Sequence, residues 1–175
     1  MLGRSLHDLR ASRSGVAAAE MALVTPLLLV LMMGAFEVGN YFYSEHVVAT
    51  AVRDGARYAS RLPFTYYPCG GAINPTSAES NIKNITMNGA ISGGNQRLAN
   101  WNNVNSVTVT FACVASGFTY VDNGIFRGLS GGVRFVTVTA VVPYKSLFAR
   151  FGITNAHTLN GINLVAQSQA AVVGI

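Results

Sequence analysis

The sequence has little charge, and what it has is unevenly placed. Only 11% of the 175 residues are Asp, Glu, Lys or Arg, whereas soluble domains average about 25%. The shortage is concentrated in residues 14–36, which hold almost no charge and most of the longest apolar run. The remainder, rich in Gly, Asn, Ser and Thr, is typical of one modest globular domain, so we expect an apolar segment joined to a single domain.

The sequence also lacks the motifs of common catalytic and cofactor sites. It contains no Gly-rich phosphate loop between a strand and a helix, and no G-x-S-x-G nucleophile elbow. Beyond residue 62 the acidic residues are Glu79 and Asp122, too far apart in sequence to suggest paired-carboxylate chemistry. We therefore expect no catalytic residues, no enzymatic activity and no cofactor.

Cysteine is scarce as well. Cys69 and Cys113 are the two cysteines, and three dispersed histidines add no ligand spacing, so the sequence predicts no metal site. Both cysteines follow the apolar run. If that part of the chain is exported, an oxidising compartment favours a disulfide between them, and two buried free thiols are the alternative.

The net charge of +5 does not form one basic patch. One group of arginines precedes the apolar run: Arg4, Arg10 and Arg13. A second group, spaced four residues apart, follows it: Arg53, Arg57 and Arg61. Membrane orientation accounts for the first group and a solvated helix face for the second. Without a basic groove lined by aromatic side chains, we expect no nucleic-acid partner.

The apolar run covers residues 16–36, VAAAEMALVTPLLLVLMMGAF. As a helix it would be about 31 Å long, enough to cross the hydrocarbon core of a bilayer. Two alternatives are a buried helix of a soluble protein and a cleaved secretory signal. The first rarely has so long an apolar run, and the second needs small residues of the A-x-A kind that LMMGAFEVGN does not offer. We therefore predict a retained anchor that contacts membrane lipid, with a cytoplasmic leader at residues 1–15.

Two residues inside the run are unusual for a membrane helix. Pro26 should kink or locally open the helix. Glu20 costs about 2.5–3.5 kcal/mol if it lies near the bilayer centre, so it requires a partner. Cleavage after Gly15 would place the new ammonium of Val16 one helical turn from Glu20, on the same chain or a neighbouring one. The spacing of these residues therefore predicts a processing site.

These residues resemble a type IV prepilin signal: a basic leader, Gly15, small residues, Glu20 and an apolar helix with Pro26. More closely, GVAAAEMALVTPLLLVLMMGAFEVGNYFY followed by ATAVRDGARYAS resembles the TadE-like pseudopilins of tight-adherence (Flp-type) pili. The resemblance implies a non-catalytic minor pseudopilin that is cut by a prepilin peptidase and acts in pilus assembly and surface adherence. It also implies pilin-like subunits as partners, and a bacterial inner-membrane location with the C-terminal domain in the periplasm.

Two other interpretations remain open. The first is a membrane-anchored extracytoplasmic binding module that never enters a filament. The second is an exported soluble protein with a cleaved signal. Neither interpretation gives a use to both Gly15 and Glu20.

The helix should continue out of the membrane over residues 37–62, because this stretch has no proline before Pro63. Small residues recur every four positions in both halves of the long helix, and this spacing lets helices approach closely. We expect them, with Pro26, to pack against neighbouring subunits, although alanine is also simply common in helices. The set is Ala18, Ala22, Ala35, Gly39, Ala51, Gly55 and Ala59.

The outer domain, residues 63–175, reads as a short helix followed by strands. Thr76 and Glu79 suggest a capping box that opens a helix ending near residue 91, with Ile82 and Ile85 inward. Alternation predicts strands near 107–113, 135–142 and 164–170, with Cys113 on the buried face of the first. A hairpin-like connection over 118–132 and a helical turn over 146–151 complete the prediction. The expected fold is α+β: a long N-terminal helix packed on a small antiparallel sheet, similar to pilin-like proteins.

Overall fold

The computed structural model describes residues 13–99, 101–114, 132–148 and 161–174. For residues 13 and 14 it describes the backbone only. The chain divides into two compact units, residues 1–40 and 41–175. Within the described part of the first unit, the backbone is entirely helical. The second unit contains the remainder of the same helix, a short helix and a sheet.

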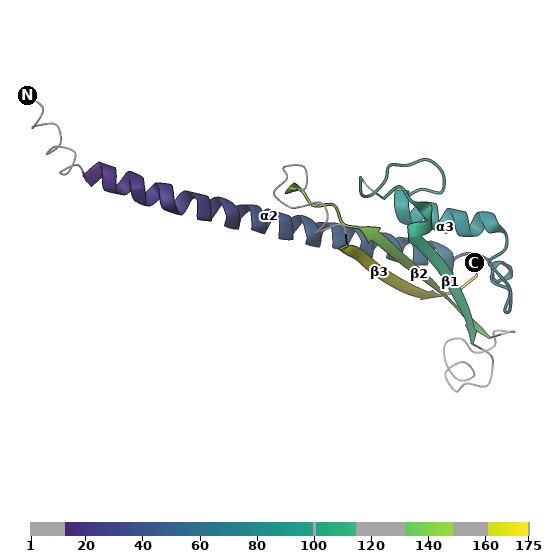
Figure 1. Cartoon of the computed structure of the whole chain (residues 1–175). Coiled ribbons are helices and arrows are strands. Elements are labelled where there is room, and N and C mark those ends of the chain that lie inside the picture. The colour runs from purple at the N-terminus through teal and green to yellow at the C-terminus, as the bar shows by residue number, and fades with distance from the viewer. Residues whose placement is uncertain (1–12, 100, 115–131, 149–160, 175) are drawn as a thin grey trace, which may run out of the picture. The chain divides into compact units, whose positions relative to one another are not determined.

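The long helix is α2, Arg13–Ser60 (Figure 1). It stays helical through Pro26 and stops three residues before Pro63, close to the predicted end at residue 62. After it come η1 (Phe64–Tyr66), α3 (Thr76–Asn88) and η2 (Val104–Ser106). The three strands are β1 (Val107–Val114), β2 (Val133–Pro143) and β3 (Asn163–Ala171).

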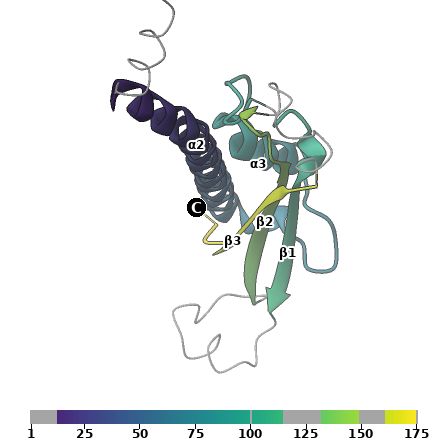
Figure 2. The same cartoon turned by 60° about the vertical axis from the view of Figure 1, so that its left-hand side comes forward.

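The strands form one antiparallel sheet in the order β1-β2-β3 (Figure 2). In one row across the sheet, Val109 of β1 lies opposite Val138 of β2, which lies opposite Ser168 of β3. The burial of β2 alternates from Val136 to Pro143 because successive side chains point to opposite faces. The α+β prediction of a long helix on a small antiparallel sheet is confirmed.

The core lies between the buried face of this sheet, the second half of α2, and α3. Val138 and Val142 contribute from the sheet, Val48 and Val52 from α2, and Ile82 from α3. All five side chains are essentially inaccessible to water. Burying a side chain of this kind stabilises the fold by about 1.5–3 kcal/mol, so this shared core holds residues 41–60 of α2 to the outer domain.

The carbonyl groups at the C-terminal end of α2 accept hydrogen bonds both from the residues that follow at once and from more distant segments. The backbone N–H groups of Arg61 and Leu62 donate to the carbonyls of Tyr58 and Ala59. The backbone N–H of Val173 donates to the Ser60 carbonyl at 2.8 Å, so the segment after β3 meets the end of α2. The hydroxyl of Tyr67 donates to the Ala59 carbonyl at 2.7 Å. Local backbone bonds close the last turn of α2, and the contacts from Tyr67 and Val173 tie it to the rest of the second unit.

The structure contains the disulfide Cys69–Cys113, with 5.8 Å between the two Cα atoms. Cys113 is half-buried, and its side chain points to the same face of the sheet as Val107 and Val109, the buried positions of β1. The pairing predicted from sequence is confirmed, and the bond ties β1 to the loop that follows η1.

The prediction for α3 was partly wrong. Pro75 occupies the N-cap position and no side chain caps the helix, so Thr76 is the first helical residue and no capping box forms. The helix ends at Asn88 instead of residue 91, because Gly89 adopts the left-handed conformation (φ +73°) that terminates helices. Ile82 is buried as expected, whereas Ile85 is half-buried and Thr86 and Met87 complete the buried face.

Two further predicted segments extend beyond the described residues: nearly all of the connection at 118–132 and half of the helical turn at 146–151 lie outside them. The three predicted strands match β1, β2 and β3 to within a few residues.

Candidate functional site: the N-terminal apolar helix

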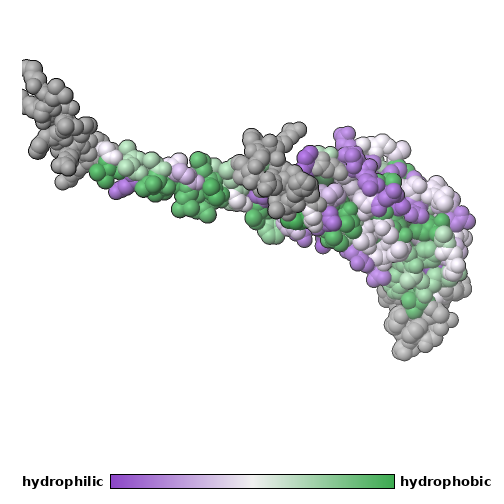
Figure 3. All heavy atoms as spheres, in the orientation of Figure 1, coloured by the Kyte–Doolittle hydropathy of each residue, from purple (hydrophilic) through white to green (hydrophobic). Residues whose placement is uncertain are grey.

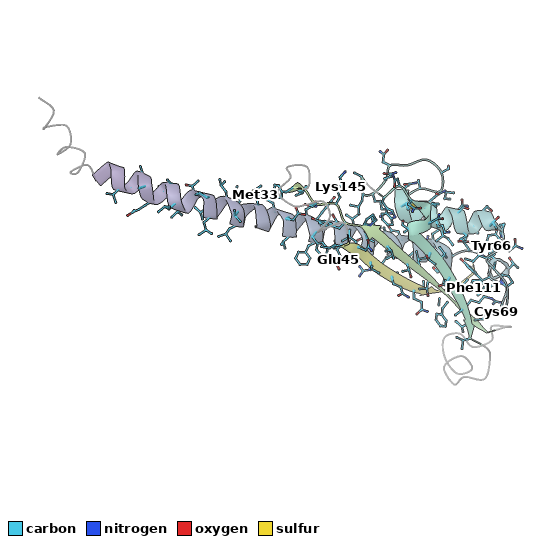
Figure 4. All side chains as sticks on the ribbon, viewed as in Figure 1. Met33, Glu45, Tyr66, Cys69, Phe111 and Lys145 are labelled. Atoms are coloured by element: carbon cyan, nitrogen blue, oxygen red, sulfur yellow. A yellow bond between two sulfur atoms is a disulfide. The ribbon has the colours of Figure 1, made fainter. Side chains whose placement is uncertain are left out.

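The first unit presents apolar side chains on every side of α2. Within residues 16–36 only Met33, labelled in Figure 4, is half-buried, and all the others are exposed. Leu23 is 81% exposed and Val30 67%. Figure 3 shows hydrophobic atoms along this part of α2. Exposed apolar surface of this extent marks a membrane or protein contact, and by length and composition the helix qualifies as a membrane span.

Glu20 interrupts this apolar surface near its N-terminal end. Its side chain is exposed, and no described residue forms a hydrogen bond or ion pair with it. The basic leader expected to precede it falls largely in residues 1–12, outside the described part of the chain. A carboxylate in a hydrocarbon environment requires a partner, so Glu20 is the residue of this helix most in need of an external contact.

The hydroxyl of Thr25, next to Pro26, has a hydrogen-bond partner within the same helix. The hydroxyl of Thr25 donates to the Met21 carbonyl at 2.6 Å, one turn earlier. Pro26 has no N–H, so it cannot donate to the carbonyl of Ala22, and α2 nevertheless remains helical there. This arrangement lets the segment carry a threonine and a proline without exposing the hydroxyl of Thr25 unpaired to lipid.

The small residues predicted to mediate packing fall into two sets. In the first unit they are exposed: Ala18, Ala22, Ala35 and Gly39. In the second unit they are buried in this chain's own core: Ala51, Gly55 and Ala59. The second set is therefore already packed within the chain, and packing between subunits remains a hypothesis for the first set and Pro26.

Gly55 makes the closest of these approaches. A Cβ atom placed on it would overlap the Thr86 hydroxyl of α3 and would lie 3.6 Å from Val138 Cγ1 of β2. The glycine therefore lets α2 approach α3 and the sheet at the same point.

Residues 15–57 match a protein family model described as "TadE-like protein". This segment of the chain is TadE-like. The match begins at Gly15 and includes Glu20, Pro26 and Gly55, in agreement with the resemblance noted from the sequence. It covers about a quarter of the chain. No curated protein and no solved structure matches significantly.

The matched family is associated with the tight-adherence pilus. The TadE-like family is structural and non-enzymatic. The part of the TadE-like segment that lies in the first unit is its apolar, exposed portion, and the part beyond residue 40 is largely built into the core of the outer domain.

Sequence reasoning missed an aromatic group where the TadE-like segment enters the second unit. The rings of Tyr41 and Tyr144 meet edge-to-face with 5.2 Å between centroids, and Tyr41 and Phe42 lie 5.8 Å apart. Phe42 and Tyr43 are exposed. The run Tyr41-Phe42-Tyr43, directly after the apolar stretch, was a sequence signal for this group.

A second missed contact is the ion pair between Arg97 and Asp54, 2.7 Å between Nη2 and Oδ2. It connects the loop after α3 to α2. Burial, with a smaller effect of nearby Tyr58, raises the pKa of the Tyr67 hydroxyl. Within the described ranges, no three His, Cys, Asp or Glu side chains gather into a group that could hold a metal ion.

Proposed function

We propose that the protein is a non-catalytic minor pseudopilin of a tight-adherence (Flp-type, type IV) pilus. In this proposal a prepilin peptidase removes residues 1–15, and residues 16–36 hold the mature chain in the bacterial inner membrane. The exposed side of this helix contacts the helices of other pilin-like subunits during pilus assembly, and the assembled pilus supports surface adherence.

One observation carries the proposal: the TadE-like match begins at Gly15 and runs through the exposed apolar helix that contains Glu20. A carboxylate in an apolar helix has a physical use if cleavage creates an ammonium nearby. The pair then forms with Val16 of the same chain or of a neighbour, and a pair between chains fixes the axial register of packed helices.

The disulfide supports the proposed orientation. Disulfides persist in oxidising compartments such as the periplasm and are rare in the cytosol. The Cys69–Cys113 bond belongs to the outer domain, so it favours a periplasmic location for residues 63–175 and a cytoplasmic location for the leader.

The first test concerns processing. We expect the mature protein to begin at Val16, as read by mass spectrometry of its N-terminus. Gly15→Ala should slow cleavage, whereas Gly34→Ala, an open position in the same helix, should leave it unchanged. An intact leader on the parent protein, in a strain with an active prepilin peptidase, would contradict the proposal.

The second test separates the pseudopilin from an anchored binding module. Glu20→Leu should leave membrane insertion, and cleavage, largely intact while reducing co-purification with other pilin-like subunits and the number of surface pili. The matched control is Met21→Leu at the neighbouring exposed position. If Glu20→Leu protein still co-purifies with its partners and supports normal pili, the register role is wrong and the binding module becomes the better interpretation.

A further inference from the structure

One end of the second unit collects exposed apolar side chains, at the point where β2 ends and β3 begins. Val141 and Val165 lie opposite each other in the sheet, and both are exposed. Beyond the strands, the Tyr144 N–H donates to the Ile162 carbonyl at 2.9 Å. Ile162 and Leu147 are also exposed, which is uncommon for so many large apolar residues at one end of a small domain.

The same end of the unit includes the first residues of its helical part. The Tyr144 ring packs against Tyr41, which packs against Phe42. Phe42 is 61% exposed and Tyr43 64%. We define the proximal patch as the exposed apolar residues of this end: Phe42, Tyr43, Val141, Leu147, Ile162 and Val165. Figure 4 labels the charged residues Glu45 and Lys145 that flank it on α2 and after β2.

Chain connectivity places the α2 residues of the proximal patch, Phe42 and Tyr43, close to a membrane surface if residues 16–36 span the bilayer. Tyr41 follows Phe36, the last residue of the apolar run, by five positions. Five helical residues rise about 7.5 Å, which is about the depth of the headgroup layer of one leaflet. Whatever angle the two units adopt, residues 41–43 cannot lie far from that layer if residues 16–36 span the bilayer.

We propose that the proximal patch inserts into the headgroup layer of the membrane that anchors the chain, so that one end of the outer domain rests on lipid. This inference depends on the proposed membrane span but goes beyond it, because a span alone would leave the outer domain free of the surface. The chemistry fits lipid. Tyrosine is enriched at membrane interfaces, and aliphatic side chains can enter the boundary of the acyl chains. Lys145 has a long apolar stem, so its ammonium can reach water while the stem lies against lipid.

The position of the patch favours lipid over another protein. The six residues come from α2, the end of β2, the segment after it, and the start of β3, and they share the end of the unit at which the chain leaves the apolar run. At the opposite end, where Val173 meets Ser60, the exposed Val173 stands on a different part of the domain. Continuity with the proposed span therefore identifies the bilayer as the occupant.

The test uses full-length protein in phosphatidylethanolamine vesicles, with and without bromine atoms near the top of the acyl chains. Bromine quenches tryptophan that reaches this depth. Trp101, the single tryptophan, is buried and gives a constant background. Leu147→Trp and Tyr43→Trp each add a reporter at an exposed position of the patch. Val173→Trp is the matched control, and Val30→Trp reports on the span itself.

We expect brominated lipid to cause a loss of the added fluorescence for Leu147→Trp, Tyr43→Trp and Val30→Trp, and none for Val173→Trp. If Val30→Trp is quenched while Leu147→Trp is not, the inference is wrong and the span stands. If Val30→Trp is not quenched, the span is wrong and the inference falls with it. Equal quenching of Val173→Trp would also overturn the inference. A blue shift of Leu147→Trp without quenching, growing with protein density, would show that a second copy covers the patch instead.

Discussion

Gly55→Ala tests whether α2 and α3 are as close as the structure places them. The added Cβ would overlap the Thr86 hydroxyl, which is fully buried and donates to the Ile82 carbonyl at 2.8 Å. Val138 Cγ1 of β2 lies 3.6 Å from the same Cβ position, so the sheet also borders this point. Thr86 must then rotate and lose its hydrogen bond, and the helices must also separate slightly to fit the added carbon.

The free-energy change follows from three effects. Overpacking of a core costs about 1–3 kcal/mol. A buried hydroxyl left without a partner costs about 1–3 kcal/mol. Alanine gains about 1 kcal/mol over glycine in a helix interior. We therefore expect Gly55→Ala to lower the free energy of unfolding by about 3 kcal/mol.

Removing the hydroxyl should relieve the overlap. The Thr86 Cβ would lie 3.4 Å from the new Cβ, close to ordinary contact, so the Thr86→Ala background accommodates Gly55→Ala. We expect the second substitution to cost about 1 kcal/mol or less in that background, which gives a large coupling in a double-mutant cycle.

Urea unfolding of the full-length protein in detergent, followed by the fluorescence of Trp101, measures these differences. Trp101 is buried and its Nε1–H donates to Ser106, so its emission reports loss of the core. Gly39→Ala is the control, because nothing lies within 4 Å of the added atom in the same helix. Equal stability of Gly55→Ala and the parent, or an equal loss in the Thr86→Ala background, would refute the close approach.

Three further predictions use the same assay. Cys69→Ser/Cys113→Ser should lower the free energy of unfolding by roughly 4 kcal/mol, because the disulfide closes a loop of 44 residues in the unfolded chain, and a reductant should produce the same loss in the parent alone. The pKa of Tyr67 is raised in the folded state above its unfolded value near 10, so the parent should lose stability as pH rises above about 10, and Tyr67→Phe should flatten that loss. Asp54→Asn should cost about 1 kcal/mol and be insensitive to salt, whereas the parent should weaken at high salt as the pair with Arg97 is screened; an equal salt response in both would show that this pair contributes nothing.

Several features were predictable because they depend on local sequence. The exposed apolar helix follows from a long run of apolar residues. The strands follow from the alternation of apolar and polar residues, such as Val107, Val109 and Phe111 with polar residues between them. The disulfide was predictable because Cys113 shares the parity of those buried positions. The start of α3 was not predicted correctly. Thr76 and Glu79 have the spacing of a capping box, but Pro75 occupies the cap position and Thr76 is already helical.

An N-terminal apolar helix with Gly15 and Glu20 at its head, and an outer domain with strands and a disulfide, follow from the order of the residues alone. What each stretch of that helix touches depends on the packing of the folded chain. Ala18 and Ala22 have the same four-residue spacing as Ala51 and Gly55, yet the first pair is exposed and the second is buried under the sheet and α3. Spacing fixes which side chains share a helix face, whereas burial of that face depends on segments that arrive from more than thirty residues away in the chain.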